Sequence, residues 1–265
     1  MEYISRYAEK DIERALRSVG AVLVVGPKFC GKTTTSMRFQ NSFVKLNTNS
    51  RIKLARLNPM LALNGERPRL IDEWQQTPKL WDMVRFEVDH RRGMGQFILT
   101  GSAVPAKLEE LHHTGTGRIT RLLMRPMSLW ESGDSNGKIS LKDLFSAPPS
   151  IAAENGNDLH RIAYLICRGG WPQAALLDSD EEIALDQAFD YYDSVVNADI
   201  QRVDEKGRNP ERVKLLMKSY ARSQGTQTSL AEIVKDMVIN DQSSLDENTI
   251  NSYLDALRKI FVVED

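Results

Sequence analysis

Short apolar runs alternate with amphipathic segments along the first 125 residues. Residues 22–25 are fully apolar, which predicts a strand buried on both faces of a sheet. Two further runs end in polar residues: 70–71 precedes Asp72 and 97–99 precedes Thr100, while 119–124 is another strand candidate. Apolar positions at helical spacing predict helices over 4–18 and 81–88. Strands that alternate with helices indicate an α/β domain with a parallel sheet.

The remainder of the chain has a different pattern. Residues 133–157 are rich in Gly, Ser, Asn and Pro, which predicts a domain junction with a short helix near 141–145. Beyond it, an apolar stripe over 185–200 predicts a long helix packed in a core. Asn209 before Pro210, and Ser229 three residues before Glu232, predict two helix N-termini. The last apolar run, 260–263, predicts a strand.

Four segments follow from this pattern: an α/β domain over 1–132, the junction over 133–157, a helical region over 158–222, and a final module over 223–265.

Composition narrows the class of protein. The 265 residues carry 35 Lys and Arg against 36 Asp and Glu, so a generally basic nucleic-acid-binding surface is excluded. The longest apolar run, 21–25, is far shorter than the roughly twenty residues of a membrane span. The two cysteines, Cys30 and Cys167, cannot form a disulfide framework. We expect a soluble cytoplasmic protein without a membrane segment.

The strongest chemical signal is a phosphate-binding loop. Residues 26–33, GPKFCGKT, match the pattern G-x-x-x-x-G-K-[ST] between a predicted strand and a predicted helix over 33–39. Loop amides and a helix N-terminus can surround phosphate oxygens, Lys32 can reach the β- and γ-phosphates, and Thr33 can bind Mg²⁺. The predicted nucleotide-binding residues are Gly26, Pro27, Lys28, Phe29, Cys30, Gly31, Lys32, Thr33 and Thr34. Cys30 lies in this loop, so we expect a lowered thiol pKa.

Two further strand ends carry polar residues suited to hydrolysis. Asp72 can hold Mg²⁺ together with Thr33, and Glu73 can orient and deprotonate the attacking water, unless Glu73 only caps the following helix. Thr100 and Ser102 follow the next strand and are candidate sensors of the γ-phosphate; an ordinary strand-to-loop turn is the alternative.

Three arginines are candidates for contacts with the nucleotide. Arg118 and Arg121 follow a Gly-rich segment and suit an arginine finger presented to a neighbouring subunit; a solvated or acid-paired edge is the alternative. The segment RGGWP, which begins at Arg168, predicts a helix break and tight turn; nucleotide contact by Arg168 from a lid is the alternative.

The blocks GPKFCGKTT, RLIDEWQ, FILTGSA, GRITRLLMRPMSLWE and RGGWP occur in an order that resembles a family of prokaryotic AAA-type (AAA+) P-loop ATPases. These proteins pair a nucleotide domain with a C-terminal domain of unknown function that contains a winged helix. The resemblance implies a five-stranded parallel sheet flanked by helices, an all-helical, lid-like region and a winged helix. Asp265 falls where the wing of the winged helix should begin. We therefore expect a partial winged helix and a truncated gene product. The resemblance also implies family roles for Lys32, Thr33, Asp72 and Glu73. The family usually carries a polar amide as first sensor, where this chain has Thr100 and Ser102.

These residues predict binding of ATP with Mg²⁺ and hydrolysis by a Glu73-activated water that drives a conformational change. The alternative is a nucleotide-gated switch with little turnover that binds a protein or DNA; a small-molecule kinase fits less well.

Residues 223–265 carry eight acids and three bases, which disfavours DNA and favours a protein partner. The basic stretch 202–222 is the expected surface if nucleic acid binds. The arginine pair further predicts a homo-oligomer.

Overall fold

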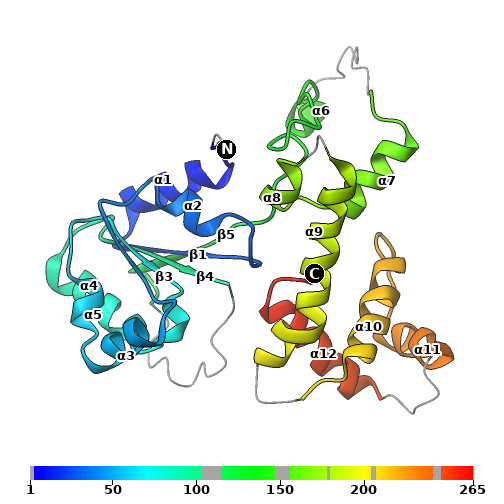
Figure 1. The fold of residues 1–265 in the computed structure, drawn as a ribbon. Helices are drawn as coiled ribbons and strands as arrows, with labels where there is room; N and C mark the ends of the chain where they lie inside the picture. The colour runs from blue at the N-terminus through cyan, green and yellow to red at the C-terminus, as the bar shows by residue number, and fades with distance from the viewer. Residues whose placement is uncertain are drawn as a thin grey trace.

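The computed structural model describes residues 3–102, 115–146, 156–177, 180–203, 207–240 and 246–264. Parts of the predicted junction (147–155) and of the basic stretch (204–206), as well as Asp265, lie outside these ranges. An α/β domain built on a sheet is followed by a purely helical part (Figure 1). Within the described residues, no helix is both long and apolar enough to span a bilayer.

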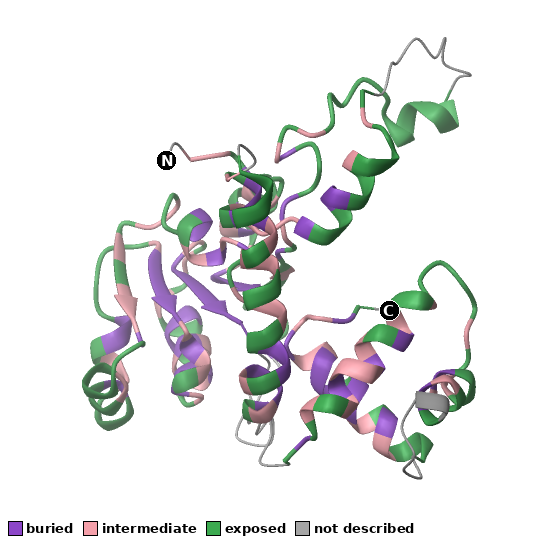
Figure 2. Cartoon of the chain, turned by 45° about the vertical axis from the view of Figure 1, so that its right-hand side comes forward, coloured by how far each residue is buried: buried purple, intermediate pink, exposed green. Residues whose placement is uncertain are grey.

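The sheet has five parallel strands in the order β2-β3-β4-β1-β5, as the resemblance implied. The strands are β1 (Ala21–Val25), β2 (Ser42–Lys45), β3 (Arg69–Asp72), β4 (Phe97–Gly101) and β5 (Ile119–Leu123). The three central strands, β1, β3 and β4, are buried at every position, which explains their continuous apolar runs (Figure 2). Because all strands run the same way, the polar residues that follow them meet at one edge of the sheet.

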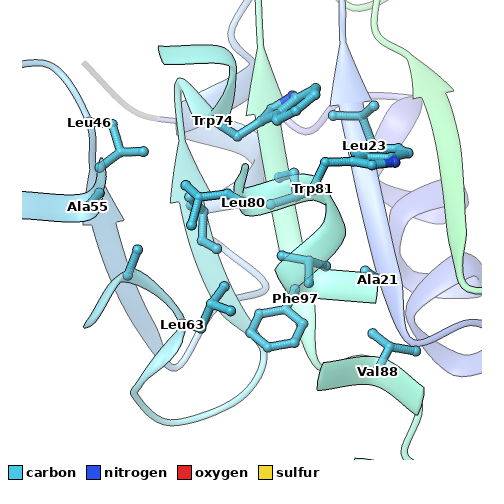
Figure 3. Packing of buried hydrophobic residues seen from close by; sticks show 14 of the residues in the cluster. Ala21, Leu23, Leu46, Ala55, Leu63, Trp74, Leu80, Trp81, Val88 and Phe97 are labelled. Carbon is cyan, nitrogen blue, oxygen red and sulfur yellow. The ribbon is translucent and has the colours of Figure 1, made fainter. Parts of the chain in front are cut away.

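Helices cover both faces of the sheet. One face packs against α1 (Ala8–Ser18) and the segment that contains α2 (Lys32–Ser36), through Val22, Val24 and Ile98. The other packs against α3 (Asn49–Leu57), α4 (Met60–Leu63) and α5 (Leu80–Arg91), through the side chains drawn in Figure 3. A three-layer arrangement results, with the phosphate-loop segment starting at the end of the central strand β1.

The helical part begins with α6 (Leu141–Ser146), α7 (Leu159–Arg168) and α8 (Pro172–Ala175). A long helix follows, in which α9 (Glu181–Ser194) continues into a π-helical segment (Val195–Asp199) and a 3-10 turn (Ile200–Arg202). The chain then forms α10 (Pro210–Arg222), α11 (Leu230–Asn240) and α12 (Glu247–Lys259). The π-helical segment shares one hydrophobic core with α10, α11 and α12.

Three sequence predictions about elements need correction. The run 260–263 forms a turn rather than a strand, and Ile260 and Val263 pack into the helical core. The helix after the phosphate loop has five residues instead of seven. Phe189, in the predicted apolar stripe, is 68% exposed, although Val195, Val196 and Ile200 of that stripe are buried.

Candidate functional site

The phosphate loop leaves β1 and turns into α2, the context that the motif requires. Gly26 has φ +153°, and a Cβ there would lie 2.0 Å from the carbonyl oxygen of Met124, so only glycine fits the first position of the loop. Gly31 precedes α2 in a left-handed conformation. Both glycines of the motif therefore have positive φ, a conformation that favours glycine.

Lys32 is buried, with 6% of its surface exposed. Its ammonium donates to the carbonyl oxygens of Gly26, at 3.0 Å, and Pro27, at 2.6 Å. Burial lowers the pKa of Lys32, while the thiol of Cys30 and the carboxylates of Glu73 and Asp72 oppose that shift. Among the described residues no carboxylate lies within ion-pair distance of this ammonium, so its charge is left for an anion.

Asp72, at the end of β3, contacts both the phosphate loop and the end of β4. It is almost fully buried, and its Oδ1 accepts hydrogen bonds from the Thr33 hydroxyl, at 2.7 Å, and from the Thr100 hydroxyl. The adjacency of β3 and β4, with Asp72 opposite Thr100, produces the second contact. One carboxylate and one hydroxyl at this distance are oxygen ligands of the kind that Mg²⁺ takes alongside nucleotide phosphates and water.

Sequence reasoning missed Lys45 in this cluster. Its ammonium lies 3.9 Å from Oδ2 of Asp72, because Lys45 is the register partner of Asp72 on the neighbouring strand β2. No local signal could have identified it, since the strand itself was not predicted.

Glu73 lies beside Asp72, half-buried, in a left-handed backbone conformation with φ 60°. Its Oε2 accepts a hydrogen bond from the Gln75 amide at 2.5 Å. Although Glu73 precedes the 3-10 helix Trp74–Gln76, its side chain makes no capping hydrogen bond. The simple capping alternative therefore lacks the contact that would define it.

Ser102 follows β4 and is buried, at the same edge of the sheet as Thr100. The structure thus brings Lys32, Thr33, Asp72, Glu73 and Thr100 to one edge of the sheet, with Ser102 next to them in sequence.

The arginines lie elsewhere. Arg118 precedes β5, at the opposite edge of the sheet from the phosphate loop, and pairs with Asp89 at 2.9 Å. The guanidinium of Arg121 lies 5.8 Å from the ring centre of Phe261. Arg168 is 1% exposed and pairs with Asp134 at 2.7 Å, so it does not face a nucleotide as a lid residue would. The lid alternative is therefore not supported, whereas the predicted helix break is confirmed, because α7 ends at Arg168 and Gly169 follows with φ 68°.

The prediction for Cys30 is also wrong. Burial raises the pKa of its thiol, and the opposing charges of Lys32 and Arg6 do not overcome this effect. The thiol donates to the carbonyl of Met124 at 3.3 Å and is fully buried, so Cys30 acts as a packed core residue.

The phosphate loop also contacts the helical part directly. Lys28 forms an ion pair with Asp199 of the π-helical segment. The ring of Phe29 meets that of Tyr191 edge-on, with centres 6.5 Å apart. Nearby, a cavity of about 410 Å³ is lined by Pro27, Tyr191 and the last residues of the described chain. The loop is therefore part of the contact between the two parts of the molecule.

Comparisons with known proteins agree with this geometry. Residues 18–132 match the family model described as an AAA domain, and residues 159–265 match the Domain of unknown function (DUF8612). Uncharacterized proteins of Mycobacterium tuberculosis and Mycobacterium bovis are each 30% identical over 158 residues. The matches cover 58% of this chain but 35% of each relative, so the chain spans about a third of the length of these relatives.

A solved structure, the Walker-type ATPase of Pyrococcus abyssi, superposes with a TM-score of 0.59. The superposition covers 97% of this chain and 90% of that chain, at 14% identity. At this identity the likeness concerns the fold, and it confirms the predicted P-loop α/β domain with a helical C-terminal part.

Proposed function

We propose that this chain binds ATP with Mg²⁺ and hydrolyses it, as the match of residues 18–132 to an AAA domain supports. The main support for the proposal is a pair of hydrogen bonds that Asp72 accepts from two separate motifs. Thr33 of the phosphate loop and Thr100 of β4 both donate to one oxygen of this buried carboxylate. Two motifs, 39 residues apart along the chain, thereby form one site.

Each residue has a role in this proposal. The loop amides and Lys32 hold the phosphates, Thr33 and Asp72 hold Mg²⁺, and Glu73 orients and deprotonates the attacking water. Mg²⁺, when bound, supplies positive charge beside the phosphate oxygens. Within the described part of the chain only one oxygen of the Glu73 carboxylate is bound, by Gln75, and the other is the group proposed to accept the proton from water. Thr100 and Ser102 act as sensors at the neighbouring strand end.

A calorimetric titration with Mg-ATP tests the proposal. The protein should bind Mg-ATP, and Lys32→Ala should bind it far more weakly, because the variant lacks the buried ammonium. Arg14→Ala is a suitable control, since Arg14 is exposed on α1. Absence of binding heat in the unsubstituted protein, or unchanged affinity in Lys32→Ala, would overturn the proposal.

A second candidate function, a nucleotide-gated switch with little turnover, is favoured by the contact between Lys28 and Asp199. This pair links the phosphate loop to the helical part without any intervening element. The two candidates differ in rate: steady hydrolysis supports the ATPase, whereas tight binding with negligible turnover supports the switch.

We expect a protein partner rather than nucleic acid. In the basic stretch, Arg208 is buried, Lys214 pairs with Glu211 and Arg222 pairs with Asp236. These contacts reduce the charge that the stretch can offer to phosphates. The helices α11 and α12 belong to residues 223–265, the candidate winged-helix-like module. The free cysteines Cys30 and Cys167 support a cytoplasmic location.

A further inference from the structure

Two side chains from outside the phosphate loop bind its backbone carbonyls. Nη1 of Arg6, in the N-terminal segment, donates to the carbonyl oxygen of Cys30 at 2.7 Å. Nε1 of Trp171, in the segment RGGWP, donates to the carbonyl oxygen of Lys28 at 3.2 Å. The donors are 24 and 143 residues away from their acceptors along the chain.

The geometry of the peptide bond gives these contacts a consequence for the loop amides. In a planar trans peptide, the carbonyl of one residue and the N–H of the next point in opposite directions. A donor that holds the Cys30 carbonyl therefore fixes the direction of the Gly31 N–H, and one that holds the Lys28 carbonyl fixes that of the Phe29 N–H. Both Phe29 and Gly31 have positive φ, 61° and 99°, so this part of the loop needs such restraint.

Arg6 is itself held rigidly. It is 6% exposed, and its Nε forms an ion pair with Glu131 at 2.9 Å. Its Nη2 donates to the carbonyl of Arg125 at 2.9 Å. Glu131, the last residue of the block SLWE, also accepts from the backbone N–H groups of Tyr7 and Ser128, each at 2.8 Å. The guanidinium can therefore act as a fixed support for the loop.

Trp171 is held by packing against two segments. A Cβ at Gly170 would lie 2.1 Å from the carbonyl oxygen of Met127, so glycine is needed for the close approach of the two chains. The Met127 N–H donates to the carbonyl of Gly170 at 2.6 Å. The indole ring then packs on Tyr191, with ring centres 4.4 Å apart.

We propose that Arg6 and Trp171 are positioning residues of the phosphate loop, which hold the Cys30 and Lys28 carbonyls outward so that the following N–H groups face the bound phosphates. The inference rests on the proposed function, since it assumes that the loop binds a nucleotide. It gives the blocks SLWE and RGGWP a common role, because Glu131 orients Arg6 and Gly170 places Trp171.

Two conservative variants test the inference. Arg6→Lys keeps a positive charge but cannot make all three of the arginine's contacts, and Trp171→Phe keeps a ring but removes the N–H donor. Affinity is measured by titration with Mg-ATP and, separately, with tripolyphosphate, which lacks the base and sugar. Each variant should bind both ligands about tenfold more weakly, the effect of losing one hydrogen bond that orders a binding group.

Arg69→Lys is the matched control. Arg69 is also a buried arginine that donates to a backbone carbonyl, that of Ala62, but it begins β3 at the edge of the sheet away from the loop. Its replacement should lower the free energy of unfolding without lowering the affinity for Mg-ATP or for tripolyphosphate. A merely structural role of Arg6 and Trp171 would make all three variants behave alike.

The outcomes separate the inference from the function on which it rests. Variants that bind like Arg69→Lys, or that lose affinity for Mg-ATP but not for tripolyphosphate, would overturn the inference alone. An unsubstituted protein that binds neither ligand would overturn the proposed function and the inference together. If Arg6→Lys does not fold, Trp171→Phe decides, because it removes a single donor.

Discussion

At the scale of the residue, the site contains side chains that can only accept hydrogen bonds or only donate them. Asp72 accepts hydrogen bonds from two hydroxyl groups, and Lys32 donates to two carbonyls. Glu73 also accepts, from the Gln75 amide, but among the described residues only one of its two carboxylate oxygens is bound. Its left-handed backbone costs a non-glycine residue about 1–3 kcal/mol, a cost of the kind that is common at functional sites.

We expect Glu73→Gln to retain Mg-ATP while its hydrolysis rate falls by about 10²–10⁴, the usual effect of losing a general base. Binding survives because the amide keeps the size and leaves Lys32 and Asp72 in place. A single-turnover assay measures the rate. Glu66→Gln, an exposed acid of the same domain, is the control and should be unaffected. Equal rates in both variants would assign Glu73 a structural role.

The buried pair of Arg6 and Glu131 predicts a dependence of stability on pH. Burial alone would raise the pKa of Glu131, but hydrogen bonds from Ser128, Tyr7 and Arg6 together lower it below its ordinary value of 4.5. A lowered pKa in the folded state stabilises the fold above the unfolded value. This stability is lost as the pH falls from about 4.5 through the lowered pKa.

Glu131→Gln should therefore be less stable by about 1–3 kcal/mol at pH 7 and should lose less stability than the unsubstituted protein below pH 4.5. Urea unfolding at pH 7 and at pH 3.5 measures both effects. Parallel loss of stability in the two proteins on acidification would contradict the assigned role of Glu131.

At the scale of the element, local signals predicted some boundaries and failed for others. Asn209 and Ser229 are N-caps as expected, because capping depends on neighbouring residues: Asn209 accepts from the N–H groups of Glu211 and Arg212, and Ser229 exchanges hydrogen bonds with Glu232. The strand β2 was missed because an edge strand needs no continuous apolar run. Residues 260–263 have such a run, but Ile260 and Val263 are buried in the helical core, so an apolar run there does not indicate a strand.

The same reasoning applies to the site. Lys32, Thr33, Asp72 and Thr100 were predictable because each follows a recognisable strand or belongs to the loop motif. Lys45, Arg6 and Trp171 were not, because they reach the site from an unpredicted strand or across long separations along the chain. Local patterns thus identified the polar residues that gather at the candidate site, and the residues that contact them from elsewhere required the tertiary structure.

Asn209→Ala should destabilise the helical part by about 1 kcal/mol, because two N–H groups at the start of α10 lose their acceptor. Denaturant unfolding monitored by circular dichroism measures the change. Asn251→Ala is the control, since Asn251 is exposed in the interior of α12, where alanine is the better helix former. An unchanged midpoint for Asn209→Ala would show that α10 does not need its cap.

At the scale of the whole molecule, we predict that Arg118 acts on a neighbouring subunit rather than at its own site. It lies at the edge of the sheet opposite the phosphate loop, next to the first residue of β1, whose N–H donates to the Arg118 carbonyl. Its pair with Asp89 is exposed on both sides, and such pairs contribute only about 0.2–1 kcal/mol. Arg118 can therefore exchange this partner for a nucleotide on an adjoining subunit at small cost.

If Arg118 acts in this way, specific activity should rise with protein concentration, since an arginine supplied in trans accelerates phosphoryl transfer by about 10³–10⁵. Arg118→Ala should abolish the rise and leave nucleotide affinity nearly intact. Activity is measured per subunit from dilute to concentrated samples, with Arg14→Ala as the control. Activity that stays constant across this range would leave Arg118 as a solvated edge residue.

The ion pair between Lys28 and Asp199 has a consequence for the search for a partner. Suppose that a ligand of the helical part alters this pair and thereby changes the affinity for nucleotide by some factor. Thermodynamic reciprocity then requires nucleotide to change the affinity for that ligand by the same factor. A partner can thus be sought through its effect on nucleotide affinity alone, and the reverse measurement checks the result.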